Sequence, residues 1–444
     1  MKKRSRLLVF ALWLTAIQVC YGQTSLPEPP MTLPKPKIAA RKVQQGSVRE
    51  IHDSALVVDT HADTTQRLLD EDFDLSTDTP TSEGHLDLGK ARRGNLGAEF
   101  FSIWVDPKEF KGQFAHRTLQ LIDAIIQQAR KNSGQMVMAY SAGDIVKARA
   151  PREPRFAALM GIEGGHSIEN DLGLLRDYYR LGVRYMTLTW SNTNEWADSS
   201  GDIDDKTVAH HNGLTNFGKD VVREMNRLGM MVDVSHVSDK SFYNTLLVSR
   251  APVIASHSSA RAITNHPRNM TDDMLRAVAL NNGVVMVNFY SAFIDEDFRR
   301  QYEAMKDQRT AALDAVQEKL KNADPATRYR ESEKAGKEWA AKIPRPPLKS
   351  LIDHIDHIAK VAGVDHVGIG SDFDGIPSLP EGIDSAADLP RITAALVARG
   401  YTRDQVHKIL GGNLMRVFRD CERVSREINS QDSFFDPRLR QNRK

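Results

Sequence analysis

The chain has 444 residues, with 60 Lys and Arg against 58 Asp and Glu, a formal net charge of +2 and 41% hydrophobic residues. This composition is typical of a globular protein with a substantial core and excludes a mostly disordered chain. The near balance of charge gives no electrostatic reason to expect nucleic acid or an anionic membrane surface as a partner.

The first 22 residues are arranged like an export signal. A basic head with Lys2, Lys3 and Arg4 precedes a mostly apolar run, and small residues follow at a position suited to cleavage. The apolar run is shorter than the ~20 residues that cross a bilayer, so we expect no stable membrane span. A retained anchor, or lipidation at Cys20, is the alternative. We therefore predict a signal peptide over 1–22 and a protein that is exported, to the periplasm or the extracellular space.

The folded domain is expected to cover 47–444. Five prolines within 25–37 disfavour helix and central strand, which indicates an extended linker over 23–46. Cleavage of the signal would leave Cys421 as the sole cysteine, so no intrachain disulfide is expected.

Within the domain, short apolar runs that end in polar residues alternate with longer segments of helical apolar spacing. The runs expected as strands are 55–59, 97–105, 156–162, 185–189, 230–234, 253–255, 284–288 and 366–370, and helical segments include 172–181, 214–228 and 274–281. Near-continuous apolar strands are typical of a buried parallel sheet. The alternation indicates either a (β/α)8 barrel or a doubly wound sheet.

The segment 295–342 interrupts this alternation. It is dense in Arg, Lys, Glu, Asp and Ala and has few large apolar residues. This composition predicts a charged helical insertion with a solvated surface, and a lid over the active site is the alternative.

Metal-binding residue types stand at the ends of several expected strands. They are His61, Asp63, Glu163, His236, His257 and Asp372. In a barrel the carboxyl ends of the strands meet at one mouth, where ligands from distant parts of the chain converge. Imidazole and carboxylate together suit zinc, and a carboxylate can bridge two ions. Each residue alone is a weak signal, but the joint pattern predicts a metal centre.

These residues lie in motifs that resemble the membrane (renal-type) dipeptidase family of the amidohydrolase superfamily. The motifs are His61-Ala-Asp63, Gly161-Ile-Glu163-Gly-Gly, Asp233-Val-Ser-His236, Ser256-His257-Ser-Ser-Ala, Arg268-Asn and Gly368-Ile-Gly-Ser-Asp372-Phe-Asp374-Gly375. Further blocks at His85, Gly97 and Leu410 extend the resemblance across nearly the whole mature chain.

The resemblance implies a zinc-dependent dipeptidase with two zinc ions per chain and a dipeptide as its substrate. It implies that His61 and Asp63 bind the first zinc, that Glu163 bridges both, and that His236 and His257 complete the second.

The resemblance also assigns the remaining roles. It implies that Asp372, which with Glu163 forms the catalytic pair, carries the proton from water to the leaving amine. It implies that Arg268 binds the terminal carboxylate of the substrate, a task that suits a planar guanidinium.

One position departs from the family pattern. Trp190 stands where the family usually has a histidine that contacts the substrate. An indole accepts no proton and donates one hydrogen bond, so stabilisation of an oxyanion from this position is in doubt. The indole N–H could substitute, or the substrate range could have shifted.

Two other functions stay open at this point. One is another binuclear metal amidohydrolase that acts on a lactam or an N-acyl amino acid. The other is a barrel that binds without turnover, which Trp190 motivates and the full ligand set argues against.

The preferred dipeptide and the formation of a homodimer are also left open. Packing or loop-shaping roles are expected for His354, His357 and Asp374, whereas His166 is undecided between ligand support and packing.

Overall fold

The computed structural model describes residues 46–150 and 152–435. The predicted signal peptide and all but the last residue of the predicted linker lie outside these residues. Within the described ranges, no helix is both long enough and apolar enough to cross a membrane.

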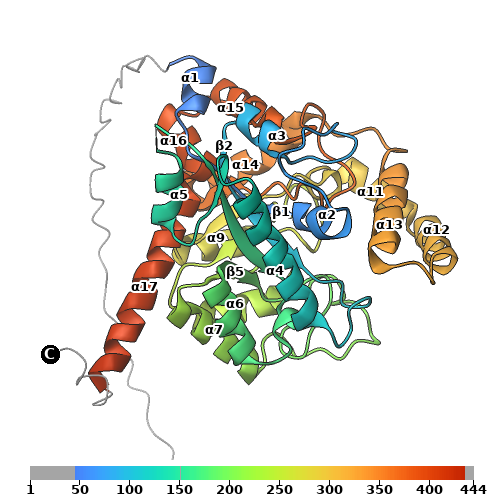
Figure 1. The fold of residues 1–444 in the computed structure, drawn as a ribbon, viewed down its shortest axis with the longest axis horizontal. Coiled ribbons are helices and arrows are strands. Elements are labelled where there is room, and N and C mark those ends of the chain that lie inside the picture. Colours follow the sequence, from blue (N-terminus) through green and yellow to red (C-terminus); the bar gives the residue numbers. More distant parts are fainter. Residues whose placement is uncertain (1–45, 151, 436–444) are drawn as a thin grey trace, which may run out of the picture. The chain divides into compact units, whose positions relative to one another are not determined.

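Parallel strands form the centre of the fold, with helices around them (Figure 1). The strands are β1 (Val57–Ala62), β2 (Leu96–Trp104), β3 (Met136–Met138), β4 (Phe156–Glu163), β5 (Val183–Thr187), β6 (Met231–Asp233), β7 (Ile254–Ala255), β8 (Val284–Val287) and β9 (Val367–Ile369). Their order is β1-β2-β4-β5-β6-β7-β8-β9, and a parallel bridge from Ala62 to Phe373 nearly closes the ring. This arrangement confirms the (β/α)8 barrel and excludes the doubly wound sheet.

Each expected strand coincides with an observed one to within a few residues. The additional strand β3 pairs with β4 outside the ring. Sequence analysis missed it because a run of three residues, Met136–Met138, carries too little periodicity to distinguish strand from loop.

Helices connect the strands and cover the barrel. They are α1 (Val48–Asp53), α2 (Thr64–Asp70), α3 (Leu88–Arg93), α4 (Phe114–Lys131), α5 (Ala142–Ala148), α6 (Leu172–Leu181), α7 (Asn216–Leu228), α8 (Asp239–Val248), α9 (Asp272–Leu280), α10 (Ser291–Ile294), α11 (Glu296–Ala304), α12 (Lys306–Lys319), α13 (Pro325–Ala340), α14 (Leu348–Ala362), α15 (Leu389–Ala398), α16 (Arg403–His407) and α17 (Asn413–Phe435).

Helix α7 illustrates how the local sequence sets these boundaries. The Thr215 side chain accepts a hydrogen bond from the Gly218 amide at the N-terminus, an interaction worth about 1 kcal/mol. Gly229, at φ +87°, ends the helix in a left-handed conformation that a side chain would strain. Between these ends, Val221 and Met225 bury one face against the barrel.

Alternate residues of the strands enter two hydrophobic layers. In β2, Ala98 and Phe100 join an inner cluster, whereas Phe101 and Ile103 join the layer between strands and helices. The inner cluster includes Phe418 of α17, whose ring lies 6.3 Å from that of Phe100. Helix α17 therefore packs against the inner core of the barrel.

The segment 295–342 forms α11, α12 and α13. Helix α12 has no buried residue among those described, and α13 buries only Ala340. Helices α12 and α13 lie against each other, and in Figure 1 they stand on the opposite side of the view from α17. Arg328 of α13 forms an ion pair with Glu109 in the loop after β2, so α13 is attached to the edge of the barrel mouth.

Candidate metal centre

The metal-binding residue types do converge at the carboxyl ends of the strands. His61 lies in β1, Glu163 is the last residue of β4, and Asp63 caps α2 directly after β1. His236 and His257 follow β6 and β7. All five side chains are buried.

Glu163 stands between the two pairs of predicted ligands. Its Oε2 atom lies 3.3 Å from Nε2 of His61, whose Nε2 lies 3.5 Å from Oδ2 of Asp63. Its Oε1 atom lies 2.9 Å from Nε2 of His236 and 3.6 Å from Nε2 of His257. Each carboxylate oxygen therefore faces a different ligand pair, which is the arrangement of a bridging carboxylate.

The ligand atoms of these side chains are better placed to bind metal ions than to hydrogen-bond one another. Nε2 of His61 is buried and has no hydrogen-bond partner among the described residues. Nε2 of His236 and Nε2 of His257 lie only 2.9 Å apart. Burial lowers the pKa of His236 to about 4 and also lowers that of His257, so both rings are neutral near pH 7 and can ligate a cation.

Hydrogen bonds behind the ligands orient two of the imidazoles. The Tyr185 hydroxyl donates to the Thr60 carbonyl, 3.0 Å away, and so accepts from Nδ1 of His61 at 2.8 Å. The Ser256 hydroxyl donates to Asp233 at 2.5 Å and accepts from Nδ1 of His257 at 2.8 Å. In both rings the proton is placed on Nδ1, which leaves the Nε2 lone pair for a metal.

The backbone around the site adopts uncommon conformations. His236 and Asp372 have φ of +66° and +64°, a region that non-glycine residues adopt rarely and mostly at functional sites. At Gly375 a Cβ atom would lie 2.0 Å from Oδ2 of Asp63. A side chain there would displace a predicted ligand.

Asp372 lies beside this cluster, with ligand atoms of His61 and Asp63 within 4.8 Å. Asn288 donates a hydrogen bond of 2.8 Å to its Oδ2 atom. Burial raises the pKa of Asp372 to about 7, with His61 opposing the shift and Asp63 adding to it. A carboxyl group with such a pKa can both take up and release a proton near neutral pH.

Arg268 provides an anion-binding group at the same mouth. Its guanidinium donates to the His257 carbonyl at 3.1 Å and to the Ser258 hydroxyl at 3.4 Å, and it is only 6% exposed. None of the described carboxylates forms an ion pair with it, and its Nε is buried without a partner. Burial lowers its pKa to about 10, while Asp372 and Glu163 oppose the shift, so the group stays charged near pH 7.

Trp190 forms part of the wall of the mouth. Its ring centroid lies 6.4 Å from that of His236 and 4.9 Å from that of Trp104, the last residue of β2. Trp190 thus places an aromatic surface beside a predicted ligand.

The histidines and the aspartate that were not predicted as metal ligands make structural contacts. His354 is buried and bonds the Ala260 amide, His166 bonds the Val105 carbonyl, and His357 pairs with Asp272. Asp374 accepts hydrogen bonds from the His85 amide and the Thr64 hydroxyl.

Sequence analysis missed the residues that support the ligands. Tyr185 lay inside an expected strand and Asp233 inside a quoted motif, but neither was given a role. A polar side chain within an otherwise apolar strand was the available signal.

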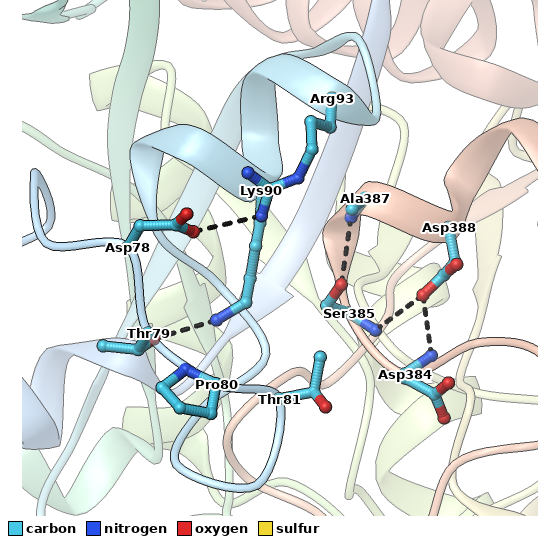
Figure 2. Close-up of a pocket in the computed structure, with 10 residues that line it drawn as sticks. All are labelled: Asp78, Thr79, Pro80, Thr81, Lys90, Arg93, Asp384, Ser385, Ala387 and Asp388. Atoms are coloured by element: carbon cyan, nitrogen blue, oxygen red, sulfur yellow. Dashed lines mark hydrogen bonds and ion pairs between the residues drawn. The ribbon is translucent and has the colours of Figure 1, made fainter.

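The described residues also line cavities that contain none of the predicted metal-binding side chains. One of about 590 Å³ lies between α3 and the short helix η3 (Ala386–Asp388), as Figure 2 shows. The aspartates that line it already have cationic partners, since Asp78 pairs with Arg93, Asp384 with Arg345 and Asp388 with Arg391, and no cluster of metal-binding side chains forms here among the described residues. This cavity therefore offers no competing metal site.

Comparison with known proteins identifies the family of the chain. The model of the membrane dipeptidase family, peptidase family M19, matches residues 45–432. Dipeptidase tcpJ of Claviceps purpurea (strain 20.1) is 36% identical over 356 residues, which are 78% of this chain and 72% of that protein.

Solved structures show the same fold. The probable dipeptidase PvdM from Pseudomonas aeruginosa has a TM-score of 0.70 and 26% identity, covering 85% of this chain and 98% of that one. A metallopeptidase from Rhodobacter sphaeroides, liganded with a phosphinate mimic of the dipeptide L-Ala-D-Ala, has a TM-score of 0.65 and 25% identity, covering 83% and 99%.

Proposed function

The chain belongs to the membrane dipeptidase family, peptidase family M19, and from this premise we propose that it is a two-zinc enzyme that cleaves dipeptides with a free carboxylate. Metal-dependent dipeptidase activity follows from its relatives. The number and kind of ions and the role of each residue are the parts that we propose.

The observation that carries the proposal is the position of Glu163 between two ligand pairs. In this assignment His61 and Asp63 hold one ion, His236 and His257 hold the other, and Glu163 bridges them. These residues would hold two zinc ions, which when bound would provide a water nucleophile at neutral pH and polarisation of the scissile carbonyl.

Asp372 is proposed to carry the proton. Asn288 occupies one of its carboxylate oxygens, which leaves the other to accept the proton of the attacking water. The same oxygen then delivers the proton to the nitrogen of the leaving amine. One group performs both transfers because its pKa lies close to the working pH.

Arg268 is proposed to fix the position of the substrate relative to the metal ligands. Its buried charge, which forms no ion pair with a described carboxylate, favours an anion, and the carboxylate of a dipeptide is one that its planar fork can bind in a bidentate manner. Holding that carboxylate brings the single peptide bond over the metal ligands and accounts for a preference for dipeptides.

A hydrolysis screen tests the proposal. Zinc-loaded protein should cleave free L,L or L,D dipeptides and leave lactams and N-acyl amino acids intact. Cleavage of the latter substrates alone would instead identify a broader amidohydrolase, and binding of dipeptides without turnover would identify a non-catalytic barrel.

We also propose that the protein is exported. Support comes from the basic head and apolar run of residues 1–22, which lie outside the described residues. N-terminal sequencing of the mature protein from the extracytoplasmic fraction should find a chain that begins near residue 23.

A further inference from the structure

One face of α13 looks toward the metal-binding residues. Tyr329, Glu333 and Lys337 follow one another at intervals of four residues and therefore share a face of the helix. All three are partly buried, whereas the neighbouring residues Arg330 and Glu331 are exposed. This face of the insertion therefore carries a tyrosine, a carboxyl group and an amino group that are partly withdrawn from solvent.

An aromatic wall connects this face to the metal centre. The rings of Tyr329 and Trp104 lie 6.1 Å apart, those of Trp104 and Trp190 4.9 Å apart, and Trp190 lies beside the predicted ligand His236. The indole nitrogen of Trp104 is buried and has no hydrogen-bond partner among the described residues. Electron-rich ring faces of this kind attract cations.

Glu333 adds a negative charge beside this wall. Glu333 stands one helical turn after Tyr329, whose ring lies 6.1 Å from that of Trp104. Burial raises the pKa of Glu333 to about 7, Lys337 opposes the shift, and Asp63 and Asp374 add to it. The described residues give Glu333 no hydrogen bond and no ion pair. A carboxylate that has no partner among the described residues favours binding of a cation from outside the chain.

The strand order places this region across the mouth from Arg268. In the ring β1-β2-β4-β5-β6-β7-β8-β9, β2 and β7 are four strands apart and hence opposite. Trp104 ends β2, and the Arg268 guanidinium bonds the carbonyl of His257, which follows β7. A substrate held at Arg268 by its carboxylate that crosses the metal centre therefore extends its N-terminal residue toward Trp104 and α13.

We propose that Glu333, together with the rings of Tyr329 and Trp104, binds a positively charged amino group on the N-terminal residue of the substrate. Aromatic faces combined with a carboxylate form a recognition site for an ammonium group. The inference rests on the dipeptidase function proposed above. Two sources of the group are distinguishable: the α-ammonium of any free dipeptide, and the side-chain ammonium of an N-terminal lysine.

The experiment compares two pairs of substrates with the zinc-loaded enzyme. Ala-Ala against N-acetyl-Ala-Ala measures recognition of the α-ammonium, and Lys-Ala against norleucyl-Ala measures recognition of the side chain. Where the uncharged member is cleaved too slowly, its inhibition constant replaces its KM. The variants are Glu333→Gln, which removes the charge at constant shape, and Glu331→Gln, an exposed position on the same helix.

Wild-type enzyme should prefer the charged member of at least one pair. Glu333→Gln should reduce that preference about tenfold, mainly through KM, since a charge-assisted contact is lost at a partly solvated position. The zinc content of Glu333→Gln should equal that of the wild type. The control Glu331→Gln should keep the wild-type substrate preference. The pair that responds identifies the source of the ammonium group.

Two results would overturn the inference: no preference in either pair, or ratios in Glu333→Gln that stay within about twofold of wild type. Failure of the wild-type enzyme to cleave any dipeptide would overturn the proposed function itself, and the two failures are therefore distinct.

Discussion

The Nδ1 atom of His61 lies 2.8 Å from the hydroxyl of Tyr185, and the two groups meet inside the barrel without access to solvent. Because that hydroxyl donates to the Thr60 carbonyl, it must accept from the imidazole. Tyr185 thereby holds a proton on Nδ1 of His61 and directs Nε2 of the ring at the metal centre.

Replacing Tyr185 by Phe should weaken metal binding about 10- to 100-fold, the usual effect of losing a hydrogen bond behind a ligand. Competition with a chelator of known affinity measures the change. Tyr178→Phe is the matched control, since Tyr178 is equally buried and bonds the Ser167 carbonyl instead of a ligand. Equal zinc affinity in the two variants would contradict the role of Tyr185.

Removal of metal should abolish hydrolysis, and zinc should restore it. Elemental analysis should find close to two ions per folded chain, because Glu163 faces two ligand pairs. Glu163→Gln should lower that number, since a neutral amide bridges cations poorly. A metal-free preparation with full activity would end the metal hypothesis.

Replacing Asp372 by Asn should leave the metal content unchanged while kcat falls by about 10²- to 10⁴-fold, the usual contribution of a positioned proton carrier. The metal ligands stay in place, and only the proton acceptor is lost. Steady-state kinetics on one good dipeptide checks this. A loss smaller than about threefold would remove Asp372 from the proposed role.

The pH profile should carry the signature of the same carboxyl group. Asp372 must be ionised to accept a proton, and its pKa is raised to about 7, so kcat/KM should fall as the pH drops through the acid limb. Bound cations lower the pKa of a nearby carboxyl group, which moves the limb below pH 7. The limb should disappear in Asp372→Asn, and a limb of unchanged position and depth in that variant would assign it to another group.

Arg268→Ala should erase the preference for a free C-terminal carboxylate. Wild-type enzyme should cleave a free dipeptide roughly 10- to 150-fold better than its C-terminal amide, as expected from a charge-assisted contact of ~1.5 to 3 kcal/mol. Comparing two enzymes with two substrates separates this contact from general damage to the site. Equal cleavage of amide and acid by the wild type would show that Arg268 does not hold the carboxylate.

Much of the barrel could be predicted from local patterns. A strand buried on both faces must be apolar along its length, so runs such as 156–162 and 284–288 were visible without knowledge of their neighbours. The metal-binding residue types were visible for a related reason, because they end several apolar runs together, although each alone is a weak signal.

The sequence by itself determined which residues could reach the mouth of the barrel, since strand direction and strand ends follow from a few consecutive residues. Only the tertiary structure decided that Tyr185 orients His61, that Arg268 forms no ion pair with a described carboxylate and that α13 brings Tyr329 beside Trp104. The two contacts named here join residues that are more than 100 positions apart in the sequence. Contacts of that kind depend on closure of the ring and on the packing of helices over its mouth, and no local periodicity encodes them.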